Sequence, residues 1–129
     1  MKKSNHIKYW LDSARHDMET ARGMFQTKKY DWSLFIGHLV IEKVLKAFWV
    51  RDNSNNFPPR VHNLVKLAEQ TRVILSEDQK LFLMDINDFN LEVRYPDYKL
   101  KFYKMCNKRF TAKYFKKIEE LYLWLKKRI

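Results

Sequence analysis

The chain has few of the residues that form tight turns and covalent cross-links. Its single cysteine, Cys106, excludes an internal disulfide and a cysteine-based zinc site. Two glycines and three prolines among 129 residues are too few for the many tight turns of an all-β fold. The sequence has no run of about 18 apolar residues and no signal-peptide pattern at its start. We therefore expect a soluble cytoplasmic protein without a membrane-spanning segment.

The composition is that of a folded chain. Hydrophobic residues make up 46% of the sequence and aromatic residues 16%, which excludes a disordered polypeptide. A chain of 129 residues can bury one substantial core. No internal repeat or low-complexity stretch divides it, so we predict a single domain over residues 1–129.

Positive charge is concentrated near the C-terminus. Residues 99–129 contain 11 Lys and Arg against two acidic residues, whereas residues 1–98 contain 15 against 13. These segments account for +9 and +2 of the net charge of +11. Such a field favours an acidic partner: RNA, a nucleotide or an acidic protein surface. The alternative is a solvated basic helix face with no partner.

Helical periodicity runs through most of the chain. We predict helices from a cap at Ser4 or Asn5 to about residue 26, and then over about 30–51, 62–71, 77–94 and 107–129. Ser76 and Gln79 form a capping-box pattern, and Asn107 or Thr111 can cap the last helix. Residues 95–104 show no clear period and are expected to be irregular or extended. The fold class is all-α, an up-and-down four-helix bundle with one additional short helix.

The stretch 30–51 is apolar nearly all the way round, which predicts a helix in the middle of the bundle. Gly37 would allow a neighbouring helix to approach closely. Three polar residues interrupt the apolar surface at helical spacing: His38, Glu42 and Lys46. Buried polar groups without partners cost several kcal/mol, roughly, so this polar line needs partners.

Arg94 is the residue that we expect to face the polar line. In one interpretation, Lys46 and Arg94 bind a phosphate or ribose, Glu42 orients them, and His38 donates or accepts a hydrogen bond. In the other, the line is a structural ladder, and Arg94 binds Glu42 to join the second helix to the end of the fourth. The two interpretations are compatible if the network also lines a groove in a dimer.

Asp97 and Tyr98 extend the candidate site beyond Arg94. In the segment 94–98 they could form a ligand loop, because tyrosine rings can stack on a base. Alternatively, the segment is a helix stop whose rings pack on the bundle. The histidines His16, His38 and His62 show no metal-ligand spacing, and the sequence has no phosphate-cradling glycine loop. We expect no metal and no cofactor.

Four groups of residues, in order, resemble the HEPN domain (the higher-eukaryote and prokaryote nucleotide-binding family). They are Tyr9-Trp10-Leu11 with Ala14, Asp17 and Ala21; Tyr30, Phe35, His38, Glu42-Lys43 and Leu45-Lys46-Ala47; Pro59 with His62-Asn63-Leu64 and Leu67-Ala68; and Arg94-Tyr95-Pro96-Asp97. The resemblance covers nearly the whole chain. It implies a bundle of four to five helices that pairs into a homodimer. It also implies a minimal nucleotidyltransferase as partner, often in a toxin–antitoxin pair.

Many proteins of this kind are metal-independent ribonucleases that use an Arg followed, after four to six residues, by a His. Arg94 stands where that Arg would be, but Lys99, Leu100 and Lys101 follow at the corresponding positions, and no His occurs after His62. The resemblance therefore favours a nucleotide- or RNA-binding module that is catalytically degenerate. One alternative is a ribonuclease toxin that uses Arg94 with a substitute base such as His38. Another is a non-catalytic helical dimer that binds an acidic protein.

Overall fold

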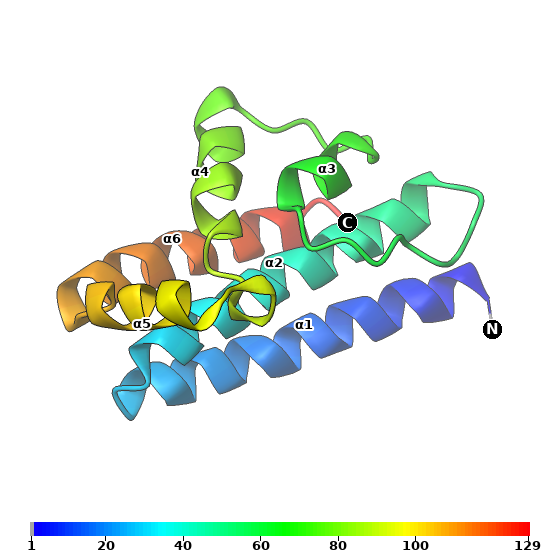
Figure 1. Ribbon diagram of the computed structural model, residues 1–129. Helices are drawn as coiled ribbons and strands as arrows, with labels where there is room; N and C mark the ends of the chain where they lie inside the picture. The colour runs from blue at the N-terminus through cyan, green and yellow to red at the C-terminus, as the bar shows by residue number, and fades with distance from the viewer. Residues whose placement is uncertain (1) are drawn as a thin grey trace.

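The computed structural model describes residues 2–129, which fold entirely into helices and connecting loops (Figure 1). The described elements are α1 (Lys3–Gln26), α2 (Tyr30–Asp52), α3 (Leu64–Glu69), α4 (Glu77–Asn87), the 3-10 turn η1 (Leu91–Val93), α5 (Pro96–Met105) and α6 (Lys108–Lys126). The predicted all-α class is confirmed. Within residues 2–129, no helix combines the length and the apolarity that crossing a bilayer requires.

Helix α2 is the central element, as its apolar sequence predicts. It lies between α1 and α6 and runs alongside both (Figure 1). Residues on every side of it are buried, including Leu34, Val40 and Phe48. At Gly37, an added Cβ would lie 2.9 Å from Cδ1 of Ile118 on α6. This confirms that Gly37 allows a close helix approach, and it explains why a larger residue would disturb the contact.

Helices α3 and α4 form a second layer over α2 and α6, and α4 stands across the long helices in Figure 1. The predicted capping box is present: the Ser76 hydroxyl accepts a hydrogen bond from Gln79 N, and the Gln79 side chain accepts one from Ser76 N. Asn63 caps α3 through Val65 N and Lys66 N. Side-chain caps thus determine where both helices begin.

The expectation that the fourth helix continues to Arg94 is wrong. Helix α4 ends at Asn87, and the chain then forms η1, which is capped by the side chain of Asn90. A helix that continued to Arg94 would place Val93 on the buried face with Ile86, but Val93 is exposed because it follows this break.

The expectation of irregular structure over residues 95–104 is also wrong, because this segment contains α5. Pro96 is the first residue of the helix, where its missing N–H needs no partner and its fixed φ suits the helix. Phe102 is buried and packs against Phe89, with 5.2 Å between the ring centroids. Pro96 therefore both ends the extended segment before it and begins the next helix.

The predicted N-terminal caps of the first and last helices differ in outcome. Asn107 caps α6 through Phe110 N, as predicted. Neither Ser4 nor Asn5 caps α1, which begins at Lys3 without a side-chain cap. The terminus of α1 is exposed, so water can satisfy its free N–H groups.

Candidate functional site

The polar line on α2 is buried, and Glu42 is the residue that joins its partners. Its Oε2 lies 3.0 Å from Nζ of Lys46, one helical turn along. Its Oε1 lies 2.9 Å from Nδ1 of His62, which precedes α3. A carboxylate can only accept, so Nδ1 of His62 carries the proton in this contact. One buried carboxylate thus joins α2 to the segment that leads into α3.

His38 belongs to the same network and is inaccessible to solvent. Its Nε2 lies 3.1 Å from the backbone carbonyl oxygen of His62 and donates to it, and its Nδ1 is buried without a partner. Burial lowers the pKa of His38 to about 4, although the nearby carboxylate of Glu42 acts to raise it. His38 is therefore neutral near neutral pH and cannot contact a ligand at the surface in this arrangement.

The cation of Lys46 is covered by α1. Its Nζ lies 5.3 Å from the ring centroid of Trp10, within the range of a cation–π interaction. The polar line therefore finds its partners at Trp10 and His62. The predicted bond between Arg94 and Glu42 is absent: Nη2 of Arg94 instead binds Oδ1 of Asp88 at 2.9 Å.

Arg94 lies in a hollow of about 240 Å³ between the end of α4 and α5. The lining residues are Asp88, Arg94, Tyr98, Lys101, Phe102 and Met105. The structure thus brings two predicted site residues together, Arg94 and Tyr98. Asp97 is exposed and does not line the hollow, and His38, Glu42 and Lys46 lie elsewhere.

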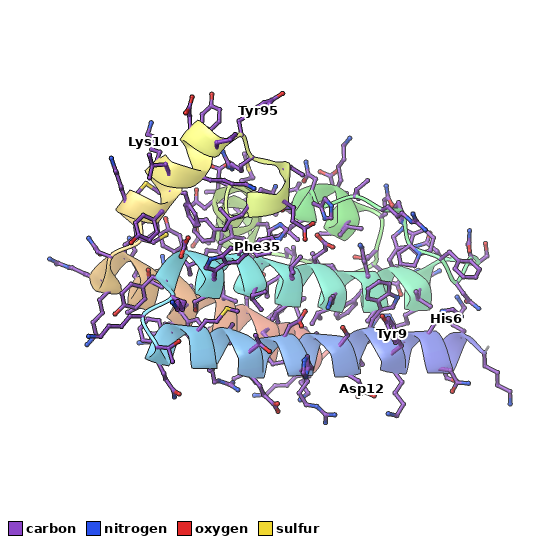
Figure 2. All side chains as sticks on the ribbon, turned by 60° about the horizontal axis from the view of Figure 1, so that its bottom comes forward. His6, Tyr9, Asp12, Phe35, Tyr95 and Lys101 are labelled. Carbon is purple, nitrogen blue, oxygen red and sulfur yellow. The ribbon has the colours of Figure 1, made fainter. Side chains whose placement is uncertain are left out.

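Sequence reasoning did not find Lys101 as a lining residue. Part of the signal was present, because Tyr98 and Lys101 are three residues apart, as on one face of a helix. It could be read only once α5 is known to be helical. The exposed surface of α5 carries further groups of the same kinds: Tyr95 is 76% exposed, and Tyr103, Lys99 and Lys104 are also exposed. Tyr95 and Lys101 lie at the α5 edge of the molecule, on the side away from α1 (Figure 2).

A second hollow, of about 190 Å³, lies beside η1. It is lined by His62, Asn63, Asn87, Asn90 and Val93. The side chain of His62 is 40% exposed, whereas that of its partner Glu42 is 6% exposed. Sequence reasoning missed this hollow because its residues come from two stretches, 62–63 and 87–93, that are far apart in the chain.

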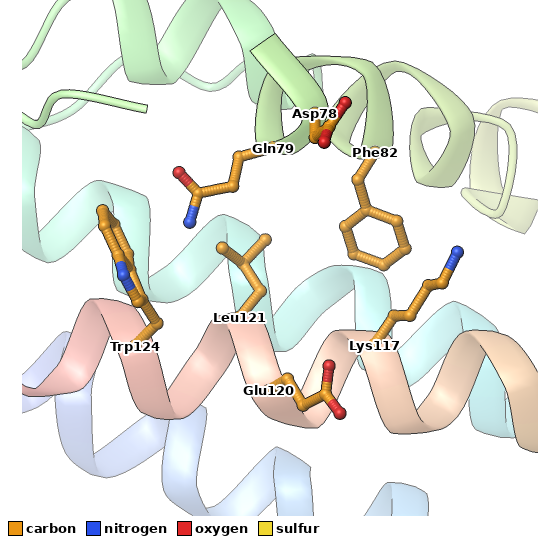
Figure 3. A pocket seen from close by; sticks show the side chains of 7 residues that line it. All are labelled: Asp78, Gln79, Phe82, Lys117, Glu120, Leu121 and Trp124. Atoms are coloured by element: carbon orange, nitrogen blue, oxygen red, sulfur yellow. The ribbon is translucent and has the colours of Figure 1, made fainter. Parts of the chain in front are cut away.

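A third hollow, of about 330 Å³, lies between α4 and α6 (Figure 3). Trp124, Leu121 and Phe82 form its apolar wall, and the charged side chains of Asp78, Lys117 and Glu120 complete the lining. Its charges are of both signs, and it contains none of the predicted site residues. Among residues 2–129, no cluster of His, Cys, Asp and Glu has the arrangement of a metal site.

Comparison with known proteins defines the class that this helical arrangement belongs to. The model of the HEPN domain matches residues 7–129, so the chain belongs to the HEPN domain family. The crystal structure of TT1696 from Thermus thermophilus is similar, with a TM-score of 0.80 and 17% sequence identity. The alignment covers 97% of this chain and 99% of that one. At this identity the likeness concerns the fold alone. No curated protein matches the chain.

Proposed function

We propose that this HEPN domain is a nucleotide- or RNA-binding module that is catalytically degenerate. The observation that carries the proposal is the hollow in which Arg94, Tyr98 and Lys101 lie together. A guanidinium and an ammonium group can both bind phosphate, and a tyrosine ring can stack on a base. Contacts to phosphates and stacking on bases are how proteins bind single-stranded nucleic acid.

The guanidinium of Arg94 is held in position without being fully used. Its Nη2 binds Asp88, but Arg donates through five N–H groups, and the remaining donors are free for phosphate oxygens. The Asp88 side chain is 79% exposed, so its pairing with Arg94 is a weak surface contact. A phosphate can therefore compete for Arg94 at little cost in stability.

The charge around this hollow favours an anionic partner. Eleven Lys and Arg lie in residues 99–129, which include most of α5 and all of α6. Their combined field attracts a polyanion before specific contacts form. The exposed tyrosines of α5 then provide surfaces for bases, which a purely acidic protein partner would not need.

Two observations support binding without cleavage. The positions four to six residues after the hollow's arginine are Lys99, Leu100 and Lys101, and lysine at its ordinary pKa is a poor base for a ribose hydroxyl. His38, the alternative base, is 0% exposed and bonded to a backbone carbonyl. The proposal accordingly uses Arg94 for binding and leaves His38 in the structural network.

The wider setting is part of the same proposal. Membership of the HEPN family supports a homodimer that acts in the cytoplasm beside a minimal nucleotidyltransferase, as one half of a toxin–antitoxin-type pair. The nucleotide- or RNA-binding surface would then be the surface through which that pair binds its nucleic-acid target. Co-purification with a co-expressed minimal nucleotidyltransferase tests this part separately from RNA binding.

The binding proposal is tested with a fluorescently labelled single-stranded RNA of about 12 nucleotides, long enough to cover one site of the usual size. We expect anisotropy to show binding that weakens steeply with salt, since each neutralised phosphate contributes about −0.7 to the slope of log K against log salt. Arg94→Ala and Lys101→Ala should each weaken binding by about tenfold, which corresponds to a lost charge-assisted hydrogen bond. The matched control is Arg60→Ala, which removes an exposed arginine outside the hollow.

Binding that ignores salt, or that is the same for Arg94→Ala and wild type, would contradict the proposal. Absence of RNA binding together with capture of an acidic protein would favour the helical-dimer alternative. RNA cleavage in the presence of a chelator, lost in Arg94→Ala, would show a ribonuclease instead.

A further inference from the structure

The hollow beside η1 presents hydrogen-bond donors rather than acceptors. Its three asparagines use their side-chain oxygens internally. Oδ1 of Asn63 accepts from Val65 N and Lys66 N, Oδ1 of Asn87 accepts from Leu64 N at 2.9 Å, and Oδ1 of Asn90 accepts from Glu92 N at 3.1 Å. The amide NH₂ groups are what remains for a ligand.

One of these NH₂ groups is buried and unsatisfied. Asn90 is 2% exposed, and its Nδ2 has no hydrogen-bond partner in the protein. Nδ2 of Asn87 donates to Oδ1 of Asn63 at 3.3 Å, which leaves its second hydrogen unused. A buried donor without a partner costs about 1–3 kcal/mol, so an acceptor that reached Asn90 would be bound favourably.

His62 adds a nitrogen to the same hollow. Its Nδ1 is engaged by Oε1 of Glu42, so Nε2 is the ring nitrogen left for a ligand. The buried carboxylate of Glu42 behind the ring holds the orientation of the imidazole. The lining thus offers NH₂ donors from three asparagines and contains no carboxylate.

We propose that this hollow, lined by His62, Asn63, Asn87, Asn90 and Val93, is a binding site for one phosphate group. A phosphate group carries several acceptor oxygens, and the phosphodiester group of an RNA has no hydrogen-bond donor. Val93 lines this hollow and Arg94 lines the neighbouring one, and consecutive Cα atoms are about 3.8 Å apart. The two hollows are thus lined by consecutive residues, and, if the proposed function holds, both bind phosphates of one RNA.

The direct test is an NMR titration of the wild-type protein with inorganic phosphate at constant ionic strength. We expect the side-chain NH₂ signals of Asn87 and Asn90 to shift saturably, while the amide of Asn56, in the loop after α2, does not. Sodium acetate is the parallel probe. Signals that stay in place with phosphate would overturn the proposal, and an equal response to acetate would overturn its assignment to phosphate.

Two variants and one control separate this proposal from the proposed function. Asn90→Asp keeps an oxygen for Glu92 N but replaces the NH₂ donor by an anion, and we expect the phosphate response of Asn87 to weaken at least tenfold. Asn56→Asp, with the same charge change outside the hollow, should leave it unchanged. Arg94→Ala should weaken RNA binding yet keep the phosphate response. RNA binding through Arg94 in a protein whose asparagines ignore phosphate would refute this inference alone.

Discussion

The carboxylate of Glu42 accepts a hydrogen bond from Nδ1 of His62 at 2.9 Å across 20 residues of sequence. The same carboxylate pairs with Lys46 at 3.0 Å, and all but a few per cent of its surface is removed from solvent. Glu42 therefore neutralises a buried ammonium group and fixes an imidazole at the surface. The energetic consequences of this arrangement can be measured.

Glu42→Leu should lower the free energy of unfolding by about 3–5 kcal/mol, because it leaves the buried Lys46 without its counter-ion. Urea denaturation at neutral pH measures the change. Glu19→Leu is the matched control, since Glu19 is exposed on α1, and a change within about 0.5 kcal/mol is expected there. Similar losses in both variants would show that Glu42 has no special role in the core.

The two glycines should respond oppositely to alanine. At Gly23 an added Cβ meets nothing within 4 Å, so Gly23→Ala should stabilise the protein by about 0.5–1 kcal/mol through helix propensity. At Gly37 the Cβ would lie 2.9 Å from Cδ1 of the buried Ile118, and overpacking should destabilise by about 1–3 kcal/mol.

Thermal unfolding distinguishes these effects. Adding Ile118→Val to Gly37→Ala removes Cδ1, the atom in conflict, and should cost less than the two single substitutions added together. Strict additivity would show that the α2–α6 contact at Gly37 is looser than described.

The stability of the protein should fall between about pH 6.5 and pH 4 because of His38. The unfolded chain binds a proton at this residue near the ordinary histidine pKa of 6.5, whereas burial lowers the folded pKa to about 4. Stability from neutral His38 is thus complete above pH 6.5 and is lost as the pH falls toward 4. The full loss is about 3.5 kcal/mol, at about 1.4 kcal/mol for each pH unit.

The measurement is the free energy of unfolding at pH 7 and pH 4.5. We expect His38→Gln to lose less stability than wild type over this interval, because its side chain does not titrate. His16→Gln, at an exposed histidine of α1, should show the same pH dependence as wild type. Parallel pH profiles for wild type and His38→Gln would exclude His38 as the source.

Cys106 should be unreactive in the folded protein. Burial raises the pKa of its thiol to about 12, so the thiolate that attacks an alkylating reagent is scarcely populated near neutral pH. Iodoacetamide should therefore label Cys106 many times faster in urea than in buffer. Equal rates in the two conditions would mean that the loop between α5 and α6 opens readily.

The helices of the fold could largely be predicted from sequence because their signals are local. The apolar stretch of α2, the Ser76–Gln79 capping box and the Asn107 cap all produce the helices that they predict. The sequence does not predict α5 because Pro96 has two opposite effects on local structure. It disfavours helical backbone at the residue before it, and it favours a helix that begins at Pro96 itself. Its buried anchor, Phe102, contacts a ring of a distant segment, which no local period shows.

The candidate site was harder to predict because its partners are not local. The spacing of His38, Glu42 and Lys46 correctly indicates a line that needs partners, but nothing in the sequence distinguishes Arg94 from His62 as the residue that meets Glu42. Arg94 follows the break after Asn87, which turns it toward Asp88. The predicted helix runs to Arg94, seven residues beyond the observed end of α4. This difference explains why the predicted contact between Arg94 and Glu42 is wrong.

The half-exposed ring of His62 connects solvent to buried residues of α2 through hydrogen bonds. One nitrogen meets Glu42, and the backbone oxygen of the same residue meets His38, so both buried residues are held from a single surface position. An acylating reagent such as diethyl pyrocarbonate that modified this ring would disturb the middle of α2 without touching it. We expect such labelling to increase the rate of amide hydrogen exchange along α2.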